Sequence, residues 1–315
     1  MTNKPVYNLE FPTGIRSLSI GGYVFYATSN YDEVHKLMPN YSVTSITGSH
    51  QITATVNIPA VEEKTILPFE NPQLTRLHDV LLFLSIFTGR NIFIKDWDGE
   101  KPITADHRPH TAFGGQLRLS ISLDSKLKIK ATEEIVDSGT ARGIPVWDME
   151  WVELGFDTAI EKVIAHVSTK EWKDMYDDGY FIFLYRDMVQ WQIVEKSFLT
   201  AWTIWESLFS IENRKWLLGK DMRDIKSELK IGYVLNKYFG ITLDQKQRGN
   251  IQLLVNARNR LVHFGKIIQS VKIAEMKMFI QSTDQVIATV LGLIPNNTLN
   301  SREHLVAFLN QDPQA

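Results

Sequence analysis

The sequence predicts an α+β protein, in which a β-rich N-terminal domain with one embedded helix precedes a C-terminal bundle of α-helices. Two observations lead to this fold class. Up to about residue 150, short runs of β-branched and aromatic residues alternate with Gly, Pro and Asn, which is typical of strands and turns. From about residue 155 onward, apolar residues recur at the spacing of helices. We therefore expect domains at 1–165 and 166–315.

The strands of the first domain are predicted from β-branched runs and from period-two alternation. These stretches are 16–28, 41–48, 50–60, 91–105, 114–123 and 126–134. Within 91–105, Asp98-Gly99 separates two extended runs, which favours a hairpin or tight turn. The embedded helix is predicted over 71–91, because leucines and a valine recur at helical spacing and Gly89 is a suitable C-terminal stop.

The helices of the second half are predicted from the same spacing and from their capping residues. They cover 156–168, about 181–211, 219–239, 245–264, 271–293 and 301–309. Asp244, Ser270 and Ser301 are expected N-caps, and Gly240 and Gly265 are expected C-terminal stops. Consecutive helices with short connections predict an antiparallel bundle.

Composition excludes several classes of protein. The chain has no cysteine, so disulfides, thiolate catalysis and Cys-based zinc sites are excluded. We see no signal peptide, and the longest apolar run is far shorter than a membrane span needs. We therefore expect a cytoplasmic protein without a membrane partner. The stretch 106–110, DHRPH, is interpreted as a surface turn, so neither a metal nor another cofactor is predicted.

Charge is distributed unevenly along the chain. Residues 1–195 contain 18 Lys and Arg against 26 Asp and Glu, whereas residues 196–300 contain 15 against 8. The helical half is therefore the better candidate for binding a polyanion such as RNA, although basic helix faces are commonly only solvated.

The helix predicted over 245–264 carries a charge in an unusual place. On a helical wheel Arg258 falls at the centre of an apolar stripe, and Arg260 points to solvent. The stripe consists of Ile251, Leu254, Val255, Leu261 and Val262. Beside it runs a polar strip of Gln252, Asn256, Asn259 and His263.

Two explanations of Arg258 remain open at this point. A guanidinium in a core stripe needs a partner or an opening to a cleft. In the structural explanation Arg258 pairs with a buried carboxylate, for which Glu206 is the candidate. In the functional explanation it lines a pocket and holds an anion beside His263, since arginine suits phosphate and histidine transfers protons near neutral pH.

The string RNRLVHF, residues 258–264, fits the R-x4-H pattern and resembles the HEPN superfamily, whose members are helical bundles that include many metal-independent ribonucleases. The surrounding LLVNARNRLVHFG is similar to HEPN domains of ApeA-type phage-defence proteins, which also place a β-rich domain before the bundle. The resemblance matches Arg258 to the family's arginine, Asn259 to its polar follower and His263 to its histidine.

The resemblance implies an endoribonuclease that works by attack of the RNA 2′-OH, without a cofactor. His263 would act as general acid or base, and Arg258 would stabilise the charge on the phosphate. Asn259 would orient His263 or a phosphate oxygen. Apart from the resemblance, we predict a supporting role for Glu206, and we predict that Arg260 and Lys266 bind RNA. The expected setting is anti-phage abortive infection, with a homodimer and a phage or cellular trigger bound by the N-terminal domain.

Two other functions remain open. The bundle could be a catalytically inactive HEPN-like module for binding or dimerisation, with Arg258 and His263 paired internally. Alternatively, the β-rich domain could bind a carbohydrate or other ligand, with the helices as a scaffold.

Overall fold

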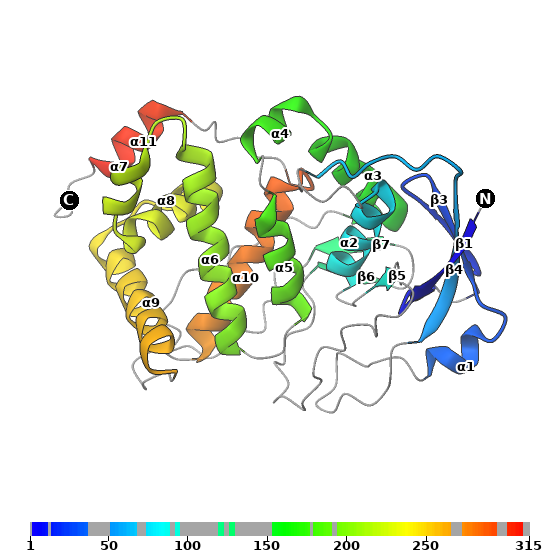
Figure 1. Ribbon diagram of the computed structural model, residues 1–315. Helices are drawn as coiled ribbons and strands as arrows, with labels where there is room; N and C mark the ends of the chain where they lie inside the picture. The colour runs from blue at the N-terminus through cyan, green and yellow to red at the C-terminus, as the bar shows by residue number, and fades with distance from the viewer. Residues whose placement is uncertain are drawn as a thin grey trace. The chain divides into compact units, whose positions relative to one another are not determined.

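A computed structural model describes the chain in two units (Figure 1). It describes residues 2–11, 14–36, 51–67, 74–88, 92–94, 119–122, 126–129, 153–176, 179–190, 194–265, 273–294 and 301–310. The first unit comprises Met1–Lys130, Trp151–Lys173 and Val189–Ile193, and the second comprises Ala131–Glu150, Asp174–Met188 and Val194–Ala315. Strands lie in the first unit and most helices in the second, so the α+β class is confirmed.

The first unit is built on an antiparallel five-stranded sheet with the order β2-β3-β4-β1-β5. Its strands are β1 (Thr2–Tyr7), β2 (Ser17–Ile20), β3 (Tyr23–Ala27), β4 (Ile52–Ile58) and β5 (Phe93–Ile94). Side chains alternate between the faces, so Val6, Phe25 and Val56 are buried on the inner face. This pattern confirms the strands predicted within 16–28 and 50–60.

Three helices and a second sheet complete this unit. The helices are α1 (Tyr31–His35), α2 (Arg76–Thr88) and α3 (Phe156–Val167), and the sheet has the order β6-β7-β8. Its strands are β6 (Leu119–Ser122), β7 (Lys126–Ile129) and β8 (Glu153–Gly155). Leu77, Val80 and Leu84 are fully buried on α2. The embedded helix predicted from their spacing is therefore confirmed.

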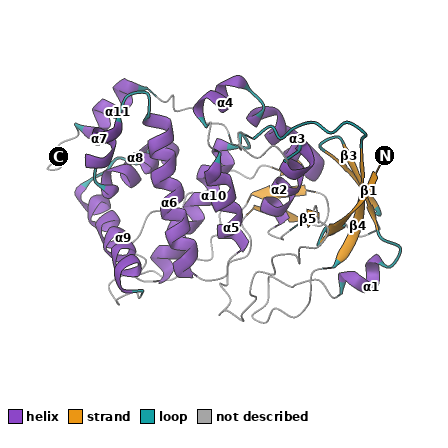
Figure 2. Ribbon diagram, viewed as in Figure 1, coloured by secondary structure: helices purple, strands orange, loops and turns teal. Residues whose placement is uncertain are grey.

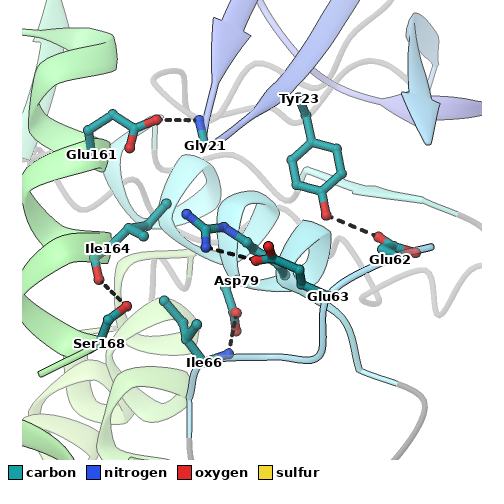
Figure 3. A network of polar contacts seen from close by, with 10 residues as sticks. Gly21, Tyr23, Glu62, Glu63, Ile66, Asp79, Glu161, Ile164 and Ser168 are labelled. Carbon is teal, nitrogen blue, oxygen red and sulfur yellow. Dashed lines mark hydrogen bonds and ion pairs between the residues drawn. The ribbon is translucent and has the colours of Figure 1, made fainter. Parts of the chain in front are cut away.

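Polar contacts fix loops of this unit to its helices, as Figure 3 shows. At the β2–β3 turn, the backbone N–H of Gly21 donates to Glu161 on α3 at 2.8 Å. Asp79 on α2 accepts from the backbone N–H of Ile66 at 2.8 Å and from the hydroxyl of Thr65. Burial raises the pKa of Asp79, and these two hydrogen bonds oppose the rise because they favour the charged carboxylate.

The second unit is a set of helices, drawn in purple in Figure 2. The helix α4 (Lys170–Met175) crosses from the first unit into the second. The others are α5 (Tyr180–Gln190), α6 (Val194–Asn213), α7 (Gly219–Asp224), α8 (Ser227–Phe239), α9 (Gln245–Phe264), α10 (Ile273–Val290) and α11 (Arg302–Leu309). Within this unit α6 packs against α8, α9 and α10, and α8 packs against α9 and α11.

Aromatic side chains form the core of the second unit. Trp202 and Trp205 on α6 and Phe279 on α10 are almost completely buried, and the centroids of Trp205 and Phe279 are 4.6 Å apart. The indole N–H of Trp205 donates to the hydroxyl of Thr283 at 2.9 Å, so this buried donor has a hydrogen-bond partner within the core. The tryptophans of α6 therefore serve packing rather than stacking on a ligand.

The predicted helix boundaries are partly corrected. The stretch predicted as one helix over 219–239 is two helices, because Ile225 and Lys226 are extended with ψ angles of 122° and 144°. The hydroxyl of Ser227, at the start of α8, donates to Glu206 on α6, which fixes where α8 begins. Gly240 adopts the left-handed conformation at φ 66° and ends α8 as predicted.

Other predictions have different outcomes. The stretch predicted as a helix over about 181–211 contains α5 and α6. The division at 165/166 stays a prediction; it lies within α3, whereas the contacts separate the units after Lys173. The strand at 41–48, the Asp98-Gly99 turn, the stretch 106–110, the stop at Gly89 and the cap at Ser270 lie outside the described residues. No helix in the described part of the chain is long and apolar enough to cross a membrane.

Candidate functional site

The helix α9 carries the R-x4-H string, and both of its ends are capped as the sequence predicts. The side chain of Asp244 accepts from the backbone N–H of Gln247 at 2.7 Å. At the other end Gly265 adopts the left-handed conformation at φ 65°, and its N–H donates to the carbonyl of Leu261 at 3.0 Å. The helix therefore ends directly after Phe264.

The buried stripe of α9 differs in part from the predicted one. Ile251, Leu254, Ala257 and Leu261 are buried, whereas Val255 is half-buried and Val262 is 53% exposed. The prediction was wrong for Val262 because the wheel describes the direction of a side chain but not where the neighbouring helices end. The last residues of α9 from position 262 onward are all exposed.

Arg258 is half-buried and does not lie at the centre of a sealed core. Its Nη1 donates to Oδ1 of the adjacent Asn259 at 3.0 Å. Arg258 forms no ion pair with Glu206 in the described part of the chain, and Oε1 of Glu206 instead accepts from the hydroxyl of Ser227. The carboxylate proposed as its structural partner is therefore occupied elsewhere.

His263 is exposed in the last turn of α9. Its ring lies near the ring of Phe264, with centroids 6.3 Å apart and an interplanar angle of 65°. Arg258 and His263 are five positions apart, which separates their directions by about 140° around the helix. Asn259 is four positions from His263 and lies on nearly the same side. Asn259 thus connects the guanidinium to the side of α9 that carries the imidazole.

The two residues predicted to bind RNA have different outcomes. Arg260 is half-buried, and its predicted role in RNA binding stays a prediction. Its long apolar stem can cover neighbouring side chains while the guanidinium reaches water, which explains partial burial of a charged residue. Lys266 lies outside the described residues.

Sequence reasoning missed a buried ionic cluster in the same unit. Lys237 on α8 and Glu212 on α6 have side chains 4% and 0% exposed, and their Nζ and Oε2 atoms are 2.8 Å apart. The hydroxyls of Tyr176 and Tyr238 donate to Oε1 of Glu212. Burial, followed by the charge of Glu212, raises the pKa of both tyrosines. The cluster joins residues distant in sequence, so no local spacing indicates it.

In the part of the chain that the structure describes, the outward positions of the five-stranded sheet carry no charged side chain. The register places Tyr26 beside Thr55, and Tyr7 beside Phe93, on the side opposite the core. The rings of Tyr7 and Phe93 stack with centroids 4.7 Å apart and an interplanar angle of 2°, and Tyr26 is 44% exposed. The other outward positions are Asn3, Pro5, Ser17, Ser19, Val24, Ile52 and Asn57.

Neither a metal site among the described residues nor a similar known protein points to a function. Over the described ranges, no group of three or more His, Asp or Glu side chains is arranged to hold a metal ion. No protein-family model matches the chain, and neither a curated protein nor a solved structure matches it.

Proposed function

We propose that the protein is a metal-independent endoribonuclease of the HEPN type, with Arg258, Asn259 and His263 as its catalytic residues. The arrangement at the end of α9 supports this proposal. Arg258 is bonded to the neutral amide of Asn259, and among the described residues it forms no ion pair with a carboxylate. His263 lies five positions further along α9 and is exposed.

The chemistry requires only these groups and the RNA. His263 removes the proton from a ribose 2′-OH, and the 2′ oxygen attacks the adjacent phosphorus. Arg258 stabilises the additional negative charge on the phosphate oxygens as the bond to the 5′ oxygen breaks. The imidazolium of His263 then gives this proton to the leaving 5′ oxygen. The products are an RNA fragment with a 2′,3′-cyclic phosphate and a fragment with a 5′-OH.

The same geometry supports the proposal of a homodimer. Arg258 and His263 leave one helix in directions about 140° apart, so they are poorly placed to contact one phosphate from the same chain. Two copies of α9 facing each other across a two-fold axis would bring the Arg258 of one chain toward the His263 of the other. We propose a cytoplasmic role in abortive infection, with the first unit responding to a phage or cellular trigger.

The test compares the wild type with His263→Ala on total bacterial RNA in the presence of EDTA, and in phage-challenged cells that express each form. We expect the wild type alone to produce fragments with 2′,3′-cyclic phosphate ends and to arrest growth. His166→Ala is the matched control, since His166 lies in the last turn of α3 in the first unit. If His263→Ala and wild type behave alike under both conditions, the nuclease proposal is wrong and an inactive HEPN-like module is favoured.

A second candidate function is binding of an uncharged ligand, such as a neutral oligosaccharide, by the outer sheet face. The absence of charged side chains from its described outward positions and the exposed ring of Tyr26 favour it. Binding to an array of neutral glycans that is lost in Tyr26→Ala would support this candidate. Equal signals from wild type and variant would count against it.

A further inference from the structure

The end of α9 exposes apolar side chains on both sides of His263. Phe264 is 71% exposed and Val262 is 53% exposed. The chain turns at Gly265 directly after Phe264, and a side chain placed at Gly265 would meet no atom within 4 Å. A mostly exposed aromatic ring thus lies next to the imidazole. Leaving such a ring in water sacrifices the hydrophobic free energy that its burial would provide.

We infer that Phe264 is a stacking platform for one unpaired nucleobase of the RNA, next to the phosphate on which His263 acts. The inference rests on the proposed nuclease function and adds a residue that selects the substrate. Adjacent positions and a centroid separation of 6.3 Å allow one nucleotide to contact both rings. Stacking requires a free face of the base, which a base inside a duplex does not offer.

The surroundings of Phe264 favour RNA over a second protein copy as the occupant. A stable protein interface buries about 800 Å² per partner, whereas one aromatic side chain buries only about 150–250 Å². Val262 and Phe264 are therefore too small to form a dimer interface by themselves. Arg260 lies four positions before Phe264, on nearly the same side of α9. Cations beside an exposed aromatic ring are the combination that binds single-stranded nucleic acid.

Phenylalanine also determines which kind of selectivity to expect. Its ring has no hydrogen-bonding group, so it can stack on any base without reading the base edges. The platform should thus select strandedness and not sequence. Every accessible unpaired nucleotide would be accepted, and paired regions would be cleaved less.

The experiment measures RNA binding in the His263→Ala background, so that no cleavage occurs. The probe is a fluorescent 12-nucleotide single-stranded RNA, compared with the same strand annealed to its complement. We expect Phe264→Ala to weaken single-strand binding by about 5- to 150-fold, and Phe264→Trp to retain it. Leu218→Ala is the matched control, because Leu218 is 73% exposed in the same unit. It should leave binding unchanged.

Three outcomes would overturn the inference. The first is equal single-strand affinity for Phe264→Ala and its parent. The second is equal weakening on duplex RNA. The third is a change in the molar mass of Phe264→Ala measured by light scattering, which would assign Phe264 to a protein interface. The proposed function fails separately, if wild type and His263→Ala do not differ in cleavage. In the otherwise wild-type enzyme, Phe264→Ala should raise KM for single strands with little change in kcat.

Discussion

The buried pair of Glu212 and Lys237 allows a quantitative test of the second unit. Lys237→Met leaves the carboxylate of Glu212 buried and without its cation, 2.8 Å from where the ammonium was. Glu212→Gln leaves the ammonium of Lys237 buried and also weakens the hydrogen bonds from two tyrosine hydroxyls. Removing one partner of a buried pair costs about 3–5 kcal/mol. Each single variant should therefore lose that amount of the free energy of unfolding.

The double variant Glu212→Gln/Lys237→Met should lose no more free energy of unfolding than one single variant does. It contains no unpaired buried charge, and Gln can still accept a hydrogen bond from a tyrosine hydroxyl through its amide oxygen. If the two costs were independent, they would add to about 6–10 kcal/mol, comparable with the whole stability of a typical domain. We expect a coupling free energy of about 3 kcal/mol, at the upper end for contacting residues.

The assay is urea unfolding at pH 7, followed by tryptophan fluorescence. Trp202 and Trp205 are buried on α6, the helix that carries Glu212, so their emission reports the transition of this unit. Far-UV circular dichroism of each variant at zero urea is the control for a folded starting state. A double variant whose cost equals the sum of the singles within about 0.5 kcal/mol would refute the reasoning. It would mean that the two charges are solvated separately.

Three other changes test local features. Gly21→Ala should destabilise the first unit by about 2–5 kcal/mol in thermal or urea unfolding, because φ is +60° and the new Cβ would lie 2.4 Å from Val80. Gly22→Ala is the control: its φ is also positive, but its Cβ would meet no atom within 4 Å, so it should cost only about 1–2 kcal/mol. Gly249→Ala should stabilise α9 by about 0.5–1 kcal/mol in urea unfolding, since this helical position is exposed and open. Burial and the nearby charge of Lys237 lower the pKa of His304. The unfolded state therefore binds the proton first, and the free energy of unfolding should fall as the pH drops below about 6.5. His304→Gln should flatten this pH dependence in urea titrations from pH 7 to 5.

Local signals predicted the ends of α9 well, because caps are short-range interactions. The Asp244 side chain needs only the N–H three residues later, and Gly265 needs only its own freedom to adopt positive φ. The break between α7 and α8 could not be predicted in this way. It coincides with a hydrogen bond from Ser227 to Glu206 on another helix, and no propensity within 219–239 encodes that partner.

The difference between local interactions and contacts with other helices also explains which predictions hold at the candidate site. The spacing of Arg258, Asn259 and His263 is a property of one helix, so their common placement on α9 could be predicted. Exposure depends on where neighbouring helices stop, so the prediction that Val262 is buried failed. Phe264 gave a weak signal, since an aromatic residue just before a terminating glycine is ordinary in a sequence. Only the structure shows it exposed beside His263.

The directions of Arg258 and His263 make a further prediction about how many chains form one active centre. If the Arg258 of one chain serves the His263 of its partner, a heterodimer of Arg258→Ala and His263→Ala contains one centre with both residues and one with neither. Mixing the two inactive variants under conditions that allow subunit exchange should then restore part of the RNA cleavage, and dilution below the dimer dissociation constant should remove it. The double variant mixed with wild type is the control, because its heterodimer has no centre with both residues and should only lose activity. If the mixture of single variants stays inactive although exchange is shown by labelled chains, each centre uses both residues of one chain. Asn259, which is bonded to Arg258 and lies on the side of His263, would then be the residue that brings them together.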